Sequence, residues 1–316
     1  MRRLIPATWD LLPKRRRMLS PDAPPGSVFR QAHIRLFSGA ALISLSPVWV
    51  KLTSVSPTTS GFYRVFIGGI ALMAFLVITG KSLRFSRRIW SLLVVAAIFF
   101  ALDLWFWHRS IRYIGPGLST LLANFQVFIM IFAGVLFLRQ RPSLQQLIAV
   151  PLALVGLGLI IGLDWGSLPG DYQLGVAFGL ATAVAYASYL LTMRVVREGA
   201  EHAMPIREIG TMSLIIAAIL GTSAMVEGVS LAVPTMTDFG WLLCYGLFSH
   251  GLGMMFIASS LPQVSTTEAG IALLLQPTLS FVWDVVFFAR PMTPMELAGA
   301  GIALFAIYLG SRRSNM

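Results

Sequence analysis

Three charged side chains lie inside apolar stretches of the sequence, where charge is unexpected. Arg64, Asp103 and Asp284 are each flanked by aliphatic and aromatic residues. A charge at the centre of a membrane-spanning helix costs roughly 2.5–3.5 kcal/mol on insertion scales, so charges that remain there are candidates for function. Arg64 could hold the anionic end of a ligand or pair with one of the aspartates. A fixed ion pair that only orders helices is the alternative.

Further polar residues occupy the same kind of stretch. Asp103 shares one helical face with Phe99 and Phe106, which favours a place in a binding site. His250 could titrate near neutral pH and couple the function to protons, or it could satisfy a hydrogen bond between helices. The remaining candidates could contact a ligand or join helices. They are three amides and one phenol: Asn124, Gln126, Tyr186 and Gln276.

Enzymatic chemistry is not indicated by the arrangement of these residues. The four histidines lie on different segments and Cys244 is the one cysteine, so neither a metal cluster nor a disulfide framework is expected. No glycine-rich phosphate loop ending in Lys and Ser or Thr occurs, so ATP hydrolysis by that motif is not expected. We therefore expect no catalytic site, no metal and no cofactor.

The elements that must position these residues are predicted to be membrane-spanning helices. Apolar residues make up 56% of the chain and charged residues only 12%, against about 25% charged in an average soluble protein. About 20 apolar residues cross a bilayer, and the sequence supplies one such run after another. The predicted fold is all-α, a polytopic membrane protein with ten transmembrane helices. We expect the spans at 34–51, 58–79, 89–108, 117–138, 144–162, 173–194, 209–227, 238–258, 267–288 and 294–311.

The basic residues predict how the chain lies in the membrane. The 24 Lys and Arg outnumber the 13 Asp and Glu, but they stand in breaks between apolar runs, so a nucleic-acid surface is not indicated. Basic loops are retained in the cytoplasm. With both termini inside, the basic residues outside are only Lys51, Arg109, Arg112 and Arg290. Residues 1–33 are expected to form a disordered basic cytoplasmic tail.

In this orientation the three intramembrane charges, Arg64, Asp103 and Asp284, all lie in the periplasmic half of the membrane. The second span runs inward from the periplasm, whereas the third and ninth run outward. We therefore expect that the three side chains could face a shared aqueous vestibule.

An internal repeat is indicated at an offset of 150 residues. The aligned identities are Leu102 with Leu252, Phe106 with Phe256, Ser110 with Ser260, Gln126 with Gln276, Phe137 with Phe287, Leu147 with Leu297 and Leu154 with Leu304. Chance produces some matches between leucine-rich segments, but the pattern of spans repeats as well. We expect five-helix halves at 34–162 and 173–311, the second inverted because each has an odd number of helices. The equivalence of Gln126 and Gln276 suggests a pair near the symmetry axis.

Three segments resemble a known family. They are Ser56-Pro57 through Phe62-Tyr63-Arg64, Ile114-Gly115-Pro116-Gly117-Leu118-Ser119, and Val264-Ser265-Thr266-Thr267-Glu268-Ala269. On these residues the chain resembles the drug/metabolite transporter superfamily, specifically its EamA-type ten-helix permeases. The usual proline of the fourth span in this family is Val127 here, while Pro277 is kept in the ninth.

The resemblance implies a secondary transporter that exports amino acids or related small metabolites by alternating access. Its partners would be a small-molecule substrate, the lipid bilayer of a bacterial inner membrane, and a coupling proton or counter-substrate. A homodimer is also compatible. A non-transporting membrane sensor or assembly component on the same scaffold is the alternative. The candidates for substrate binding or coupling are Arg64, Asp103, Asn124, Gln126, Tyr186, His250, Gln276 and Asp284.

Overall fold

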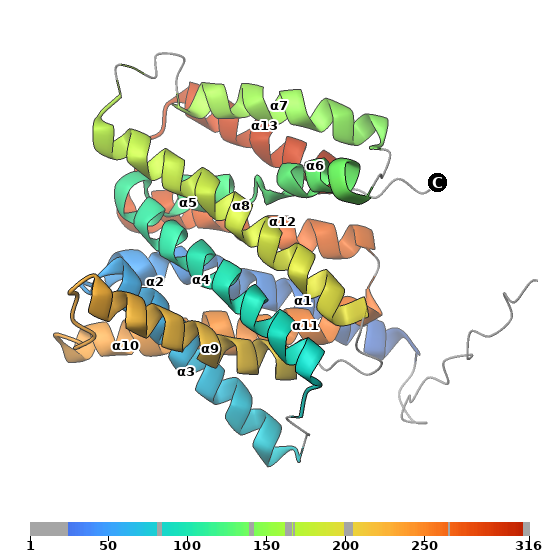
Figure 1. Cartoon of the computed structure of the whole chain (residues 1–316). Coiled ribbons are helices and arrows are strands. Elements are labelled where there is room, and N and C mark those ends of the chain that lie inside the picture. Colours follow the sequence, from blue (N-terminus) through green and yellow to red (C-terminus); the bar gives the residue numbers. More distant parts are fainter. Residues whose placement is uncertain are drawn as a thin grey trace, which may run out of the picture.

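A computed structural model of the chain describes residues 25–80, 84–138, 142–161, 166, 168–198, 205–264 and 266–311. Every regular element within these ranges is a helix (Figure 1). Ten helical segments of the described part are long and apolar enough to cross a membrane. The all-α fold and the predicted number of spans are thereby confirmed. The predicted basic tail lies outside the described residues as far as residue 24.

Several spans consist of more than one helical element. The first combines α1 with α2, the fourth α5 with α6, and the eighth α10, the π-helix η2 and α11. The elements in chain order are α1 (Pro25–Ser44), α2 (Ser46–Leu52), α3 (Pro57–Ile78), α4 (Arg87–Ile114), α5 (Pro116–Ala123), α6 (Gln126–Leu138), α7 (Leu144–Ile161), α8 (Gly170–Glu198), α9 (Pro205–Val226), α10 (Met236–Cys244), η2 (Tyr245–Gly253), α11 (Met254–Ser260), the 3-10 turn η3 (Leu261–Gln263), α12 (Thr266–Phe288) and α13 (Pro294–Ser311).

The boundaries of two segments differ from the predicted ones by more than four residues. Because α1 begins at Pro25, residues 25–33 are helical and do not belong to a disordered tail. A proline is well suited to the first position of a helix, where its fixed φ is already helical. The third span, expected to end at residue 108, continues to Ile114. It stops there because Gly115 takes a φ of 84°, and Pro116 begins the next helix.

Helices of the two predicted halves interleave. α3 packs along α9, α7 along α13 and α5 against α12, and each pair joins equivalent spans of the two halves. α4 packs along α8, so the third span contacts the sixth. The equivalent spans of the other halves are the eighth and the first, and these are also in contact, through η2 and α11 with α1. Figure 1 shows α7 and α13 together at one edge of the bundle and α3 and α9 at the opposite edge. Two equivalent halves would produce this pattern, and the inverted repeat stays a prediction.

Two apolar clusters fill the inside of the bundle. One centres on buried Leu93 and Ile216, and the other on buried Leu121 and Ala303. α8 contributes side chains to both clusters. Large apolar side chains also stand on the outside, such as Ile78 with 84% of its surface exposed. In a bilayer such side chains face lipid, while the helical backbone satisfies its own hydrogen bonds.

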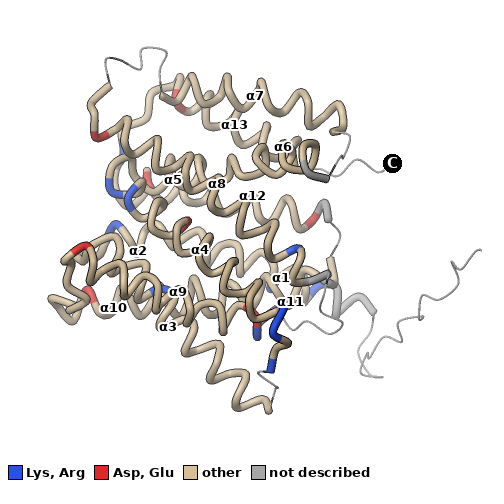
Figure 2. The backbone as a smooth tube through the Cα atoms, in the orientation of Figure 1, with Lys and Arg blue, Asp and Glu red and all other residues tan. Residues whose placement is uncertain are grey.

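Charged residues gather near the two ends of the bundle (Figure 2). The end at which α4 and α9 terminate carries Lys51, Arg109, Arg112 and Arg290. In the predicted orientation this end faces the periplasm, and we term it the outer end. The opposite, inner end carries Arg84, and Arg87 and Arg88 at the start of α4. The charged side chains that lie between the outer and the inner end are therefore the ones whose positions need a physical explanation.

Glycines allow two helices to touch near the middle of the bundle. A Cβ atom on Gly68 of α3 would lie 2.6 Å from Cδ2 of His250 and 2.7 Å from the carbonyl oxygen of Gly246 in η2. A Cβ on Gly246 would lie 2.6 Å from Cβ of Ile67. Such distances are shorter than real carbon contacts, so α3 and η2 approach each other closely only because these residues are glycines.

Replacing Gly68 by Ala should lower the apparent melting temperature of the purified protein in detergent. The added methyl group must displace His250 or the η2 backbone, and overpacking of this kind costs about 1–3 kcal/mol. Gly301→Ala is the matched control, because nothing lies within 4 Å of the Cβ that would be added there. This control should be as stable as the wild type or more stable. Equal melting temperatures for all three proteins would contradict the close approach.

Candidate functional site

Arg64 is the cation at the centre of the candidate site. It lies on α3 and is 6% exposed. Its Nη1 donates to the hydroxyl of Tyr245 at 3.0 Å, and its Nε points at Nδ1 of His250 at the longer distance of 3.5 Å. The guanidinium carbon lies 5.5 Å from the ring centre of Trp107 and 5.2 Å from that of Tyr245. No carboxylate of the described residues forms an ion pair with Arg64, so neutral rings hold this cation.

Asp103, on α4, lies within the electrostatic reach of Arg64 without touching it. The aspartate is 7% exposed, and none of the described residues donates a hydrogen bond to it. The charge of Arg64 acts on Asp103, and Asp103 acts on the phenols of Tyr186 and Tyr245. The two opposite charges are thus neighbours that do not form a contact ion pair. This geometry favours the alternative in which both charges serve a ligand.

The π-helix η2 positions two of the groups that surround Arg64. Hydrogen bonds in a π-helix join residues five apart, so Tyr245 and His250 lie above one another on one face. In an α-helix the neighbours on one face are three and four apart, and these two side chains would diverge. His250 also has its Nε2 2.7 Å from the hydroxyl of Ser213 on α9. Short π-helical stretches are frequent at functional sites.

His108 completes the cluster from α4. It is fully buried, with Nδ1 2.6 Å from the carbonyl oxygen of Leu104 and Nε2 3.1 Å from the hydroxyl of Tyr245. No pattern in the sequence marks His108 or Tyr245 as functional. Tyr245 contacts Arg64, and His108 contacts Tyr245, where α3 and α4 meet the distant segment η2. Only the position of His250 was indicated by its place in an apolar run.

Asp284 does not join this cluster, and the predicted vestibule shared by three charges is wrong in this respect. Its carboxylate is fully buried and accepts the backbone N–H of Gly117 at 3.0 Å. Lys51 Nζ lies 3.4 Å and Arg290 Nη1 3.6 Å from its oxygens. A Cβ on Gly115 would lie 2.9 Å from the same carboxylate. Because an anion is favourable at the first turn of a helix, Asp284 anchors the start of α5 and two outer cations.

The predicted amide pair is not formed. Gln126 begins α6, and its Oε1 is enclosed without a hydrogen-bond partner. Gln276 lies on α12, and no hydrogen bond joins it to Gln126 in the described part of the chain. Asn124 donates to the carbonyl oxygen of Thr120 at 2.8 Å, at the break between α5 and α6. These amides serve the local backbone or stand apart from Arg64.

The fourth and ninth spans differ in a way that their prolines do not explain. The fourth span breaks at residues 124–125 although Val127 stands where the family usually has proline. The ninth span, α12, continues as one helix through Pro277.

Tyr186, on α8, lies beside Asp103, and its ring packs 6.0 Å from that of Phe100. A pocket role for Tyr186 stays a prediction.

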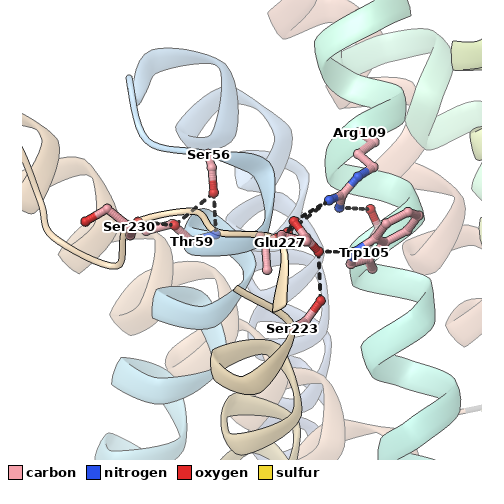
Figure 3. Close-up of polar contacts among 8 residues, drawn as sticks. Ser56, Thr59, Trp105, Arg109, Ser223, Glu227 and Ser230 are labelled. Atoms are coloured by element: carbon pink, nitrogen blue, oxygen red, sulfur yellow. Dashed lines mark hydrogen bonds and ion pairs between the residues drawn. The ribbon is translucent and has the colours of Figure 1, made fainter. Parts of the chain in front are cut away.

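Glu227 joins three helices at the outer end (Figure 3). It follows α9, and its Oε1 accepts the indole N–H of Trp105 at 2.6 Å and the hydroxyl of Ser223 at 2.7 Å. Its Oε2 accepts the hydroxyl of Thr58 and Nη2 of Arg109, both at 2.7 Å. The guanidinium of Arg109 lies 3.5 Å from the Trp105 ring centre. We term these five residues the outer clasp.

The surroundings of Glu227 favour its ionised form. Burial alone would raise its pKa, but the hydrogen bonds from Trp105, Ser223 and Thr58 together with the charge of Arg109 outweigh burial and hold the pKa below its usual value. A group with a lowered pKa in the folded state stabilises the protein above its ordinary pKa and loses that effect as the pH falls.

Sequence patterns did not indicate Glu227, because a carboxylate at the end of a span is ordinary. No three His, Cys, Asp or Glu side chains in the described ranges are placed to hold a metal ion.

Comparison with known proteins identifies the family. The model of the EamA-like transporter family matches residues 31–162 and again residues 173–312. The chain belongs to the EamA-like transporter family. The sequence pattern of this family thus occurs twice along the chain, and together the two matches cover all of its predicted spans.

Relatives of this EamA-like family member are similar over most of their length. YhbE, an uncharacterised inner membrane transporter of Escherichia coli K12, is 24% identical over 286 residues, which cover 87% of each chain. An uncharacterised transporter of Archaeoglobus fulgidus is 22% identical over 284 residues, which cover 86% of this chain and 94% of the relative. A solved crystal structure with 15% identity superposes with a TM-score of 0.62 over 88% of this chain and 97% of the other. This last similarity shows a shared fold.

Replacing Glu227 by Gln should lower the melting temperature of the purified protein at pH 7, because the variant cannot form the ion pair with Arg109. The difference from wild type should shrink as the pH falls below the ordinary glutamate pKa of 4.5, where the wild-type carboxylate becomes protonated. Thermal unfolding measured from neutral to acidic pH tests this dependence. Asp171→Asn, at an exposed position of α8, is the control. A difference that stays constant into the acid range would contradict the role of the Glu227 charge.

Proposed function

We propose that the chain is a secondary transporter that exports a small zwitterionic metabolite, such as an amino acid, across a bacterial inner membrane. The observation that carries the proposal is the pair of buried opposite charges, Arg64 and Asp103, on the adjoining helices α3 and α4. Each charge costs roughly 2.5–3.5 kcal/mol at the centre of a membrane. A molecule with a carboxylate and an ammonium group would offer a partner to both.

Alternating access is supported by the contacts at the outer end. Three of these contacts connect the two predicted halves: Arg109 with Glu227, Lys51 with Asp284, and Ser54 with Asp238. In the proposed cycle they hold the outer end closed, and they separate when the site opens to the periplasm. The partly exposed pair of Arg109 with Glu227 is suited to this role, because solvent replaces such a pair at small net cost. Asp284 is fully buried, so its separation from Lys51 requires water to enter the outer end as that end opens.

The location, the membrane orientation and the energy source are part of the same proposal. Relatives named inner membrane transporters support a location in that membrane. The inner end carries Arg30, Arg35, Arg84, Arg87 and Arg88, and basic segments of this kind are retained in the cytoplasm. Both termini are then cytoplasmic. Because the sequence lacks a phosphate-binding loop, the energy comes from a proton gradient or from exchange with a counter-substrate.

Uptake and efflux by proteoliposomes containing the purified protein test this function. A panel of labelled amino acids and related metabolites is offered under proton, sodium and counter-substrate gradients. Asp103→Asn keeps the size of the side chain and removes its charge, and it should reduce transport about 10- to 100-fold, as expected for loss of one charged hydrogen bond. Asp171→Asn, at an exposed position of α8, should transport as the wild type does. All proteins are compared at equal amounts of folded transporter.

Two outcomes would contradict the proposal. If no compound of the panel moves with the wild-type protein under any gradient, transport loses its support and a sensor or assembly role on the same scaffold gains it. If a compound moves and Asp103→Asn transports it as well as the wild type, the protein is a transporter whose site does not use Asp103.

A further inference from the structure

We propose that Tyr245, His108 and His250 are positioning residues that hold Arg64 as the receptor for a carboxylate of the transported molecule. The proposal rests on the proposed function and adds to it the part of the substrate that is recognised. Its basis is the direction of the hydrogen bonds around Arg64, the space that Gly68 leaves for His250 beside it, and the N–H donors of Arg64 that remain unused.

The first hydrogen-bond chain runs from Arg64 through Tyr245 to His108. A guanidinium can only donate, so the Tyr245 oxygen accepts from Nη1 at 3.0 Å. The Leu104 carbonyl oxygen can only accept, so the proton of His108 lies on Nδ1, at 2.6 Å from that oxygen. The Nε2 atom of His108 is then free to accept the hydroxyl proton of Tyr245 across 3.1 Å. This chain requires a neutral His108.

The second chain runs from Arg64 through His250 to Ser213. The Ser213 hydroxyl donates to the carbonyl oxygen of Ile209 at 2.7 Å, so it accepts from Nε2 of His250, also at 2.7 Å. The proton of His250 is therefore on Nε2, and its Nδ1 lone pair faces the Nε–H of Arg64 at 3.5 Å. This ring is also neutral, in the tautomer opposite to that of His108.

Gly68 on α3 leaves room for the ring of His250 beside Arg64. Gly61 and Gly68 lie three residues before and four residues after Arg64, so all three share one helical face. A Cβ on Gly68 would lie 2.6 Å from Cδ2 of His250, which is too close, whereas one on Gly61 would lie 3.4 Å from Cε1 of His108, which is an ordinary contact. The guanidinium is thereby held between two neutral acceptors, and neither reduces its positive charge.

Part of the guanidinium remains available for a ligand. Arginine has five N–H donors, and the described contacts of Arg64 engage Nε and one N–H of Nη1. Nη2 donates to none of the described residues, and it is not among the enclosed polar atoms without a partner. The unused donors match the two oxygens of a carboxylate, which arginine binds through paired hydrogen bonds. Asp103 stands nearby for a cationic group of the same molecule.

The positions of the histidine protons can be measured without any substrate. Solid-state NMR of the full-length protein, labelled with ¹⁵N-histidine and placed in lipid bilayers, reports which ring nitrogen carries the proton. We expect His108 to be protonated on Nδ1 alone and His250 on Nε2 alone near neutral pH. His108→Gln and His250→Gln assign the signals, and Arg87→Gln at the exposed inner end is the control. A doubly protonated ring, or the opposite tautomer at either position, overturns the proposal.

Transport kinetics test the receptor role. The probe is the labelled amino acid of the panel with the highest uptake, and its unlabelled carboxamide, which lacks the negative charge, should not compete with it. Tyr245→Phe should raise the concentration for half-maximal uptake about tenfold and leave the maximal rate nearly unchanged. His250→Gln, which keeps a neutral acceptor for Arg64 and a donor for Ser213, should retain more affinity than His250→Leu.

The outcomes separate this proposal from the proposed function. If the carboxamide competes as well as the amino acid, or if Tyr245→Phe changes only the maximal rate, the chain transports but Arg64 is not a carboxylate receptor. If no amino acid moves at all, the carboxylate assignment fails together with the proposed function. The histidine NMR then still decides whether the two rings hold Arg64 as described.

Discussion

The burial of a guanidinium group in the middle of the bundle is the constraint on which the site depends. An arginine at this depth requires partners that offset part of its lost hydration. The structure supplies them as ring faces and as neutral acceptors, with Tyr245 at 3.0 Å from Nη1. A carboxylate in contact would neutralise Arg64 and leave little to attract a ligand. Asp103 stands near enough to lower the cost of the charge and leaves the guanidinium unpaired.

The local backbone around Arg64 follows from this requirement. Two acceptors must approach from one helix at a spacing that an α-helix does not provide, and the π-helical segment Tyr245–Gly253 provides it. The close approach of η2 to α3 in turn requires glycine at 68 and 246. The same segment belongs to the span whose outer end carries Asp238, which accepts two hydrogen bonds from Ser54. One span therefore carries both a part of the central site and one of the contacts at the outer end.

Much of this architecture could be predicted from local sequence, and the rest could not. Hydropathy is a local property, so the ten spans were predicted within a few residues, with Gly115 and Pro116 accounting for the longer third span. Arg64 and Asp103 were recognised as candidates because a charge within an apolar run can also be seen in the local sequence. Asp284 satisfied the same criterion, but its partners are Gly117, Lys51 and Arg290, which only the tertiary structure brings to it.

The residues that sequence patterns did not indicate share a physical cause. Tyr245 and His108 owe their role to the meeting of three helices, and the π-helical turn that aligns Tyr245 with His250 has no simple periodic pattern. Glu227 has a common residue type at a common place, and its four donors come from two other helices and its own. The predicted repeat aligns Gln126 with Gln276, but equivalent positions need not be in contact.

Transport by Arg64→Gln compared with Arg64→Lys, at equal amounts of folded protein, tests the central claim most directly. Lysine keeps the positive charge but cannot offer paired donors, whereas glutamine keeps polarity and loses the charge. If Arg64 receives the substrate anion, Arg64→Gln should show no transport above empty liposomes, and Arg64→Lys should retain transport with weaker affinity. Uptake by Arg64→Gln at the wild-type rate and affinity would contradict the account.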